Sequence, residues 1–213
     1  MFRRSIILVP AFALMLGCDG TAIAPASPDL AFARAPAPQQ TVDVIDEFGT
    51  GAGVAGTATL TRTKDGLWVE INATGVVAGH AYTFWFVVFD NSKGCGEAGC
   101  GLPDLFTRQA QVTLANAGGE VAAGATHTFS AHMDRHDLGG SQLLLGDGKG
   151  VDNTYKSELH VILRSHGVEE EDAGDLADQL SMVDAFCNLP DVDFPCSDDG
   201  VMIFPPVGAP GRS

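Results

Sequence analysis

The sequence has 213 residues, with 12 basic and 27 acidic side chains and a formal net charge of −15 at pH 7. A surface this acidic argues against nucleic acid and anionic lipid headgroups as partners, because both are negatively charged. It is compatible with cation binding and also with simple solubility. The length suits one domain with a sizeable core.

The first eighteen residues predict export. Arg3 and Arg4 precede an apolar run over 5–17 that is too short to span a bilayer as a stable helix. The run ends in Leu14-Met15-Leu16-Gly17-Cys18, which resembles the lipobox of bacterial lipoproteins. That resemblance implies a signal peptide over 1–17, acylation of Cys18, and a membrane anchor in the cell envelope, in either the inner or the outer membrane. An ordinary cleaved signal with an incidental cysteine is the alternative.

Residues 18–41 are rich in Ala and Pro, which predicts a disordered tether between the lipid and the domain. Without Arg3 and Arg4 the exported chain has 10 basic and 27 acidic residues and a net charge of −17. A folded domain over 42–205 and a tail over 206–213 complete the expected organisation.

The pattern of the domain is that of short strands. Residues 67–74 alternate between apolar and polar side chains, as in a half-buried strand, and residues 81–89 are apolar on both faces, as in a central strand. Further candidates, separated mostly by Gly-rich breaks, are 42–46, 55–63, 108–115, 126–133, 141–145, 157–164 and 200–204. This spacing predicts an all-β antiparallel sandwich of roughly seven to nine strands.

The segment from Gly79 to Gly99 resembles the copper–zinc superoxide dismutase-like sandwiches and the chordin-type (CHRD) domains. Asp90, Asn91, Gly94 and Cys95 match the turn and the cysteine that follow a strand with two metal-binding histidines in those families. Here Trp85-Phe86-Val87-Val88 stands where the histidines would lie. The resemblance therefore implies a Greek-key sandwich without a copper dismutase site. The chain also resembles a family of exported bacterial proteins with a similar aromatic strand, a Glu-x-His strand ending in His-Gly, and late cysteines; no activity follows from that resemblance.

Four cysteines follow Cys18: Cys95, Cys100, Cys187 and Cys196. An even number in an exported chain predicts disulfides, and local pairing, Cys95–Cys100 and Cys187–Cys196, is the simplest of the three connectivities. A four-cysteine zinc site is the alternative, although the spacings do not match the close pairs of zinc ribbons.

Residues 157–166 contain the best candidate for a functional strip. Leu159, Val161 and Leu163 point to one face of the predicted strand. The other face carries Glu158, His160, Arg164 and His166, which suit acid–base chemistry or metal binding. We favour the alternative of a solvent-facing sheet surface, on which losing His160 or Glu158 changes stability by less than about 0.5 kcal/mol.

Two further groups of side chains contain the residue types that bind cations. His132 with His136, Asp134 or Asp137 suits zinc, with His127 pointing to the opposite face of its strand. The loop 146–153 carries Asp147, Asp152 and Asn153, oxygen ligands of the kind that calcium takes. Surface histidines and an ordinary turn are the favoured interpretations. No nucleophile motif is present.

One helix is predicted near 170–183, peripheral to the sandwich. Its apolar residues recur at helical spacing: Ala173, Leu176, Ala177, Leu180 and Val183. Carboxylates over 169–172 precede that stripe and favour a helix N-terminus.

The sequence as a whole predicts a non-catalytic, envelope-anchored binding or structural module without a cofactor or bound metal, whose ligand is a protein, a glycan or a cation. One alternative is a metal-dependent or hydrolytic enzyme that uses His160 with Glu158, or His132 with His136. The other is a degenerate dismutase-like domain without metal.

Overall fold

The computed structural model describes residues 37–46, 53–96, 99–138, 141–147, 149–185, 187 and 196–208. The predicted signal peptide, Cys18 and most of the predicted tether lie outside these residues, as does 209–213. None of the helices in the described part of the chain has the length and apolar character needed to cross a membrane.

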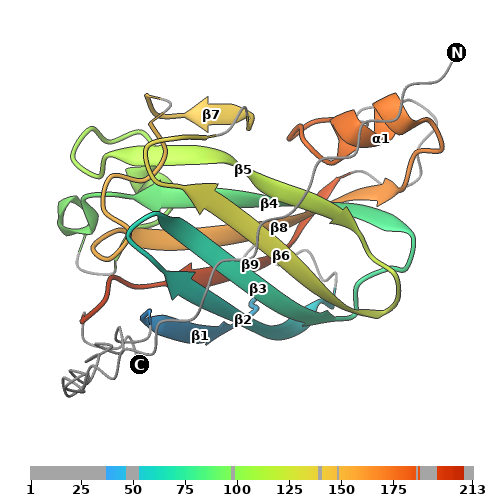
Figure 1. The fold of residues 1–213 in the computed structure, drawn as a ribbon, viewed down its shortest axis with the longest axis horizontal. Coiled ribbons are helices and arrows are strands. Elements are labelled where there is room, and N and C mark those ends of the chain that lie inside the picture. The colour runs from blue at the N-terminus through green and yellow to red at the C-terminus, as the bar shows by residue number, and fades with distance from the viewer. Residues whose placement is uncertain are drawn as a thin grey trace, which may run out of the picture. The chain divides into compact units, whose positions relative to one another are not determined.

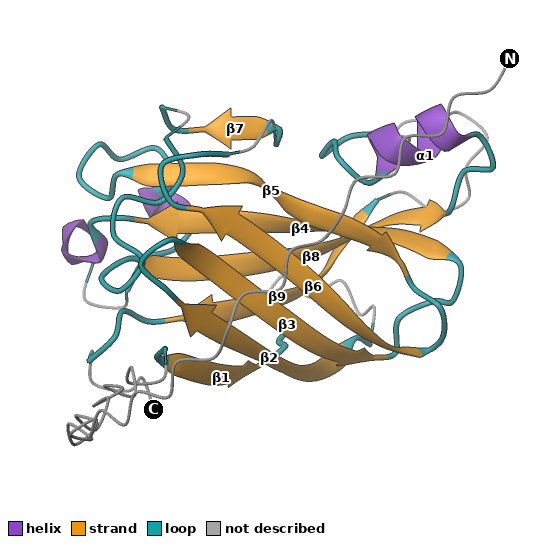
Figure 2. Cartoon of the chain, viewed as in Figure 1, coloured by secondary structure: helices purple, strands orange, loops and turns teal. Residues whose placement is uncertain are grey.

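Nine strands of the described chain form two antiparallel sheets that pack as layers (Figures 1 and 2). The first sheet has the order β1 (Gln39–Asp43), β2 (Ala55–Arg62), β3 (Gly66–Thr74), β6 (Thr126–Asp134). The second has the order β7 (Leu143–Leu145), β5 (Val112–Val121), β4 (His80–Phe89), β8 (Glu158–Val168), β9 (Ser197–Phe204). The chain leaves the first sheet for the β4–β5 hairpin and returns with β6 to pair with β3, which is a Greek-key connection. The predicted all-β sandwich is confirmed.

The main core lies between the two sheets, where each strand contributes alternate side chains. The apolar residues of β3 that the alternation pointed inward, Leu67, Val69, Ile71 and Ala73, are all buried. Phe129 of β6 contacts the rings of Tyr82 and Phe84 on β4, with centroids 5.4 and 5.3 Å apart. These aromatic contacts join the layers.

A second, smaller core covers the outer face of the five-stranded sheet. Val87 and Phe89 of β4 pack there against Cys100, Leu105 and Ala110. The covering segment contains two short 3-10 turns, η1 (Ser92–Gly94) and η2 (Leu102–Asp104), and its Cys95–Cys100 disulfide closes a loop between them. This cover explains why β4 is apolar on both faces.

Two predicted strands are displaced along the chain, and the strands predicted at 141–145, 157–164 and 200–204 differ in length from β7, β8 and β9. The first strand is not 42–46: β1 begins at Gln39 and takes in residues assigned to the tether, because its backbone pairs with β2 from Gln39–Thr61 to Asp43–Thr57. Ile45 instead exchanges two backbone hydrogen bonds with Val201 of β9, so residues 44–46 cross between the sheet edges. The strand predicted at 108–115 is β5, shifted to Val112–Val121 behind a turn at Gln111, whose φ is 51°.

The predicted helix is present but shorter, as α1 (Ala173–Gln179). The side chain of Asp172 caps it by accepting hydrogen bonds from the backbone of Gly174 and Asp175. Its buried residue is Gln179 rather than a member of the apolar stripe. The Gln179 amide donates to the carbonyl oxygens of His166 and Val168 at the end of β8. A polar contact therefore attaches this helix to the sandwich.

Candidate functional site

The predicted polar strip of β8 does lie on one face of the strand, but it is buried. Glu158 is 1% exposed, His160 7% and His166 2%. The expectation of a solvent-facing surface is wrong, because one end of this face lies under the segment around the Cys95–Cys100 disulfide and the other lies under the chain that follows α1. The polar strip therefore consists of two separate pairs, Glu158 with His160 and Arg164 with His166, and Ile162 lies between them.

The first pair is Glu158 with His160. His160 Nε2 lies 2.8 Å from Glu158 Oε1, and the imidazole ring packs against Phe89 with centroids 5.0 Å apart. His160 also lines a cavity of about 60 Å³ with Leu102, Leu105 and other apolar side chains. Pockets for small-molecule ligands have volumes of roughly 300–1,000 Å³. The cavity beside the pair is smaller than these pockets.

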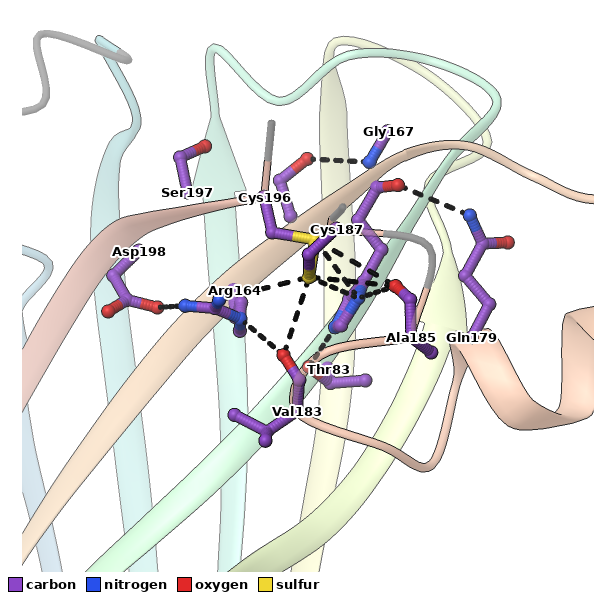
Figure 3. The surroundings of a disulfide bond; sticks show 12 residues. Thr83, Arg164, Gly167, Gln179, Val183, Ala185, Cys187, Cys196, Ser197 and Asp198 are labelled. Carbon is purple, nitrogen blue, oxygen red and sulfur yellow. Dashed lines mark hydrogen bonds and ion pairs between the residues drawn. A yellow bond between two sulfur atoms is a disulfide. The ribbon is translucent and has the colours of Figure 1, made fainter. Parts of the chain in front are cut away.

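The second pair, Arg164 and His166, lies beside the Cys187–Cys196 disulfide. Figure 3 labels Arg164 next to the two cysteines. Arg164 Nη1 contacts Asp198 Oδ1 at 2.6 Å, and its Nε donates to the carbonyl oxygen of Val183 at 2.8 Å. Both predicted disulfides are confirmed, and the four-cysteine zinc alternative is wrong because the two pairs are oxidised.

The hydrogen bonds of His166 define one tautomer. The Ala185 carbonyl oxygen, 3.1 Å from Nδ1, can only accept, so Nδ1 carries the proton. On the other side, Trp85 Nε1 donates to Thr83 Oγ1, and that hydroxyl lies 2.8 Å from His166 Nε2 and donates to it. Burial, and then the charge of Arg164, lower the pKa of His166, while its hydrogen bond to Ala185 opposes that shift. The imidazole is therefore neutral and held on both sides.

The other predicted histidine group does not form one site. His127 lies near Glu120, His132 near Asp134 and His136 near Asp152, at 3.4, 3.0 and 3.5 Å. Each imidazole thus has its own carboxylate. Among the described residues, three potential metal ligands converge in a single place, which is His166 with Cys187 and Cys196.

The predicted acidic loop also has a structural explanation. Asp147 and Asp152 line a cavity of about 420 Å³ together with Asp90, which sequence reasoning did not connect to them. Asp90 Oδ1 accepts hydrogen bonds from the backbone of Asp152 and Asn153, so it anchors the loop. Burial, aided by the neighbouring carboxylates, raises the pKa of Asp90. Lys149 pairs with Asp147 at 2.8 Å.

A further surface, which sequence reasoning missed, is the outer face of the four-stranded sheet. Trp68 of β3 and His132 of β6 are directly opposite in register, and their rings stack with centroids 4.5 Å apart and planes tilted by 31°. Trp68 remains 39% exposed. The two rings border a depression of about 420 Å³ that Thr59, Thr61 and Glu70 also line. The alternation of 67–74 did point Trp68 outward, but its partner comes from a distant strand.

Around this stack the face is made of hydroxyl, amide and carboxylate groups. Hydrogen bonds link Thr41 to Thr59 at 3.0 Å and Thr128 to Asn72 at 2.8 Å. None of its outward side chains in the described strands is Lys or Arg. They are Gln39, Thr41, Asp43, Ala55, Thr57, Thr59, Thr61, Trp68, Glu70, Asn72, Thr74, Thr126, Thr128, Ser130, His132 and Asp134. We call this set of side chains the Trp68 face.

Comparisons with protein-family models, with curated proteins and with solved structures found no match.

Proposed function

We propose that this protein is a non-catalytic binding module of the bacterial cell envelope, exported by its leader and anchored through lipid on Cys18. The lipobox-like end of the leader supports the anchor, and the Ala- and Pro-rich stretch after it supports a tether that holds the domain away from the membrane. The cavity at His160 is smaller than ligand pockets usually are, which makes the hydrolytic alternative that uses His160 weaker.

The proposed binding surface is the Trp68 face, and the proposed ligand is a neutral glycan. The stack of Trp68 on His132 beside a hydroxyl-lined depression carries this proposal. The C–H face of a sugar ring packs on an indole ring, and sugar hydroxyls exchange hydrogen bonds with Thr, Asn and Glu side chains. Because the face has carboxylates and lacks Lys and Arg, it disfavours anionic polysaccharides.

Affinity electrophoresis of the purified protein through gels that contain neutral or anionic polysaccharides tests the ligand. We expect retardation by a neutral glycan, and binding that is weaker by at least about tenfold for Trp68→Ala, as for other aromatic anchors. Phe106→Ala is the matched control, because Phe106 is an exposed aromatic residue that lies outside this face. Equal retardation of Trp68→Ala and the control, or retardation by anionic glycans alone, would contradict the proposal.

The anchor is tested separately. Mass spectrometry of the mature N-terminus should find an acylated Cys18, and Cys18→Ser should move the protein from the membrane fraction to the soluble fraction. An unmodified Cys18 in the mature protein, or cleavage well beyond it, would refute lipid anchoring without affecting the glycan test.

A further inference from the structure

His166 and the second disulfide form a compact group of potential metal ligands. His166 Nδ1 lies 3.5 Å from Cys196 Sγ and 3.9 Å from Cys187 Sγ. The ligand atoms of the three residues lie within 4.8 Å of one another. His166 belongs to β8, Cys187 to the chain after α1, and Cys196 directly precedes β9, so the tertiary fold brings them together. Figure 3 shows the two cysteines side by side.

The surroundings of His166 allow Nδ1 to act as a ligand. If a metal takes the place of the Nδ1 proton, the neutral ring carries its proton on Nε2. Thr83 Oγ1, at 2.8 Å, can then accept a hydrogen bond where it now donates one, because a hydroxyl does both. A metal-bound histidine typically has such a partner on its second nitrogen, which orients the ring.

The surroundings of the sulfur atoms favour thiolates. Arg164 Nη2 lies 3.9 Å from Cys187 Sγ, and a nearby cation stabilises the ionised form of a thiol. Asp198 holds Arg164 in place at 2.6 Å and balances its charge. Because Asp198 balances the charge of Arg164, the two negative charges of the thiolates match the charge of one divalent cation.

The other disulfide lacks these features. Cys100 Sγ contacts the carbonyl oxygen of Ser92 at 3.8 Å, and no histidine of the described chain joins this disulfide in a ligand group. Cys95 and Cys100 thus serve as an internal control with the same oxidation chemistry and without the imidazole.

We propose that the Cys187–Cys196 pair is reducible and that, in its reduced form, Cys187, Cys196 and His166 bind one zinc ion. A dithiol reductant supplies two electrons and two protons: the Cys187–Cys196 bond breaks, and the two thiols of the reductant become a disulfide. Zinc binding then releases the two thiol protons, and the His166 proton moves from Nδ1 to Nε2. Three protein ligands of this type leave the fourth zinc position for water.

Cobalt is the probe, because Co²⁺ in such a site shows sulfur-to-cobalt charge-transfer bands. The purified protein is reduced with a phosphine, freed of reductant without air, and titrated with Co²⁺ and then with Zn²⁺. We expect one equivalent of cobalt, displaced by zinc, in the reduced protein and none in the oxidised protein. Cys95→Ser with Cys100→Ser should retain this signal, and Cys187→Ser with Cys196→Ser should lose it.

Two histidine variants separate ligation from folding. His166→Gln should weaken cobalt binding by at least about tenfold, whereas His160→Gln, also buried on the outer face of β8, should leave binding unchanged. The proposal is overturned if the reduced protein binds no cobalt, if the signal depends on Cys95 and Cys100, or if His166→Gln binds as the wild type does. Wild-type binding by His166→Gln would mean that the two thiolates bind cobalt without the imidazole, as they can in an unfolded, reduced chain.

Discussion

Arg62 is a buried cation whose loss should destabilise the domain strongly. Its guanidinium group, at the end of β2, has no exposed surface. It donates to the side chain of Gln40 and to the carbonyl oxygens of Thr154, Ser157, Phe204 and Pro205. Arg62 thus joins the first sheet to the turn before β8 and to the end of β9. Arg62→Met keeps an unbranched apolar stem, although a shorter one, and removes every side-chain donor.

The magnitude follows from two opposing effects. A hydrogen bond from a charged donor contributes about 1.5 kcal/mol or more, so the four carbonyl contacts together contribute about 6 kcal/mol. Burial lowers the pKa of Arg62 to about 10, which corresponds to a burial cost of about 3 kcal/mol that the variant no longer carries. We therefore expect Arg62→Met to lower the free energy of unfolding by about 3 kcal/mol.

Urea denaturation followed by circular dichroism measures this loss. Arg62→Lys should fall between the wild type and Arg62→Met, because Lys keeps the charge but not the planar fork of donors. Arg108→Met, at an exposed site, is the control and should change stability by less than about 0.5 kcal/mol. If Arg62→Met loses no more stability than Arg108→Met, these hydrogen bonds do not stabilise the fold.

Three further predictions concern the outer face of the five-stranded sheet. His160→Ala should cost about 1–3 kcal/mol, because it leaves the buried Glu158 without the 2.8 Å contact; a loss below about 0.5 kcal/mol in urea denaturation would restore the solvated-surface interpretation. Replacing Cys95 and Cys100 with Ala should lower the free energy of unfolding by about 2 kcal/mol, the value for so short a loop, and an unchanged melting temperature would contradict this. The lowered pKa of His166 means that the unfolded chain binds its proton more readily than the folded protein. The contribution of His166 to the free energy of unfolding is therefore complete above about pH 6.5, which is the pKa of histidine in the unfolded chain, and it is lost as the pH falls below that value. Denaturation at a series of pH values should show a shallower fall for His166→Gln than for the wild type, and an equal slope would exclude this linkage.

The sequence alone was sufficient for the fold class, because local patterns carry it. The alternation of 67–74 identified the buried face of β3, and the cysteines paired with their nearest neighbours in sequence, as short loops favour. The sequence did not reveal the full extent of β1, because this strand has few apolar residues and its position is set by backbone pairing with β2.

The candidate sites were decided by tertiary structure. Period-two alternation separates the two faces of β8, but it cannot show that distant segments cover both of them, so Glu158 and His160 looked solvent-facing. His166 contacts sulfur atoms that are 21 and 30 positions away in the chain, and Trp68 contacts His132 only because β6 returns to pair with β3. Such contacts depend on long-range pairing and on burial by other parts of the chain, and no local pattern encodes them.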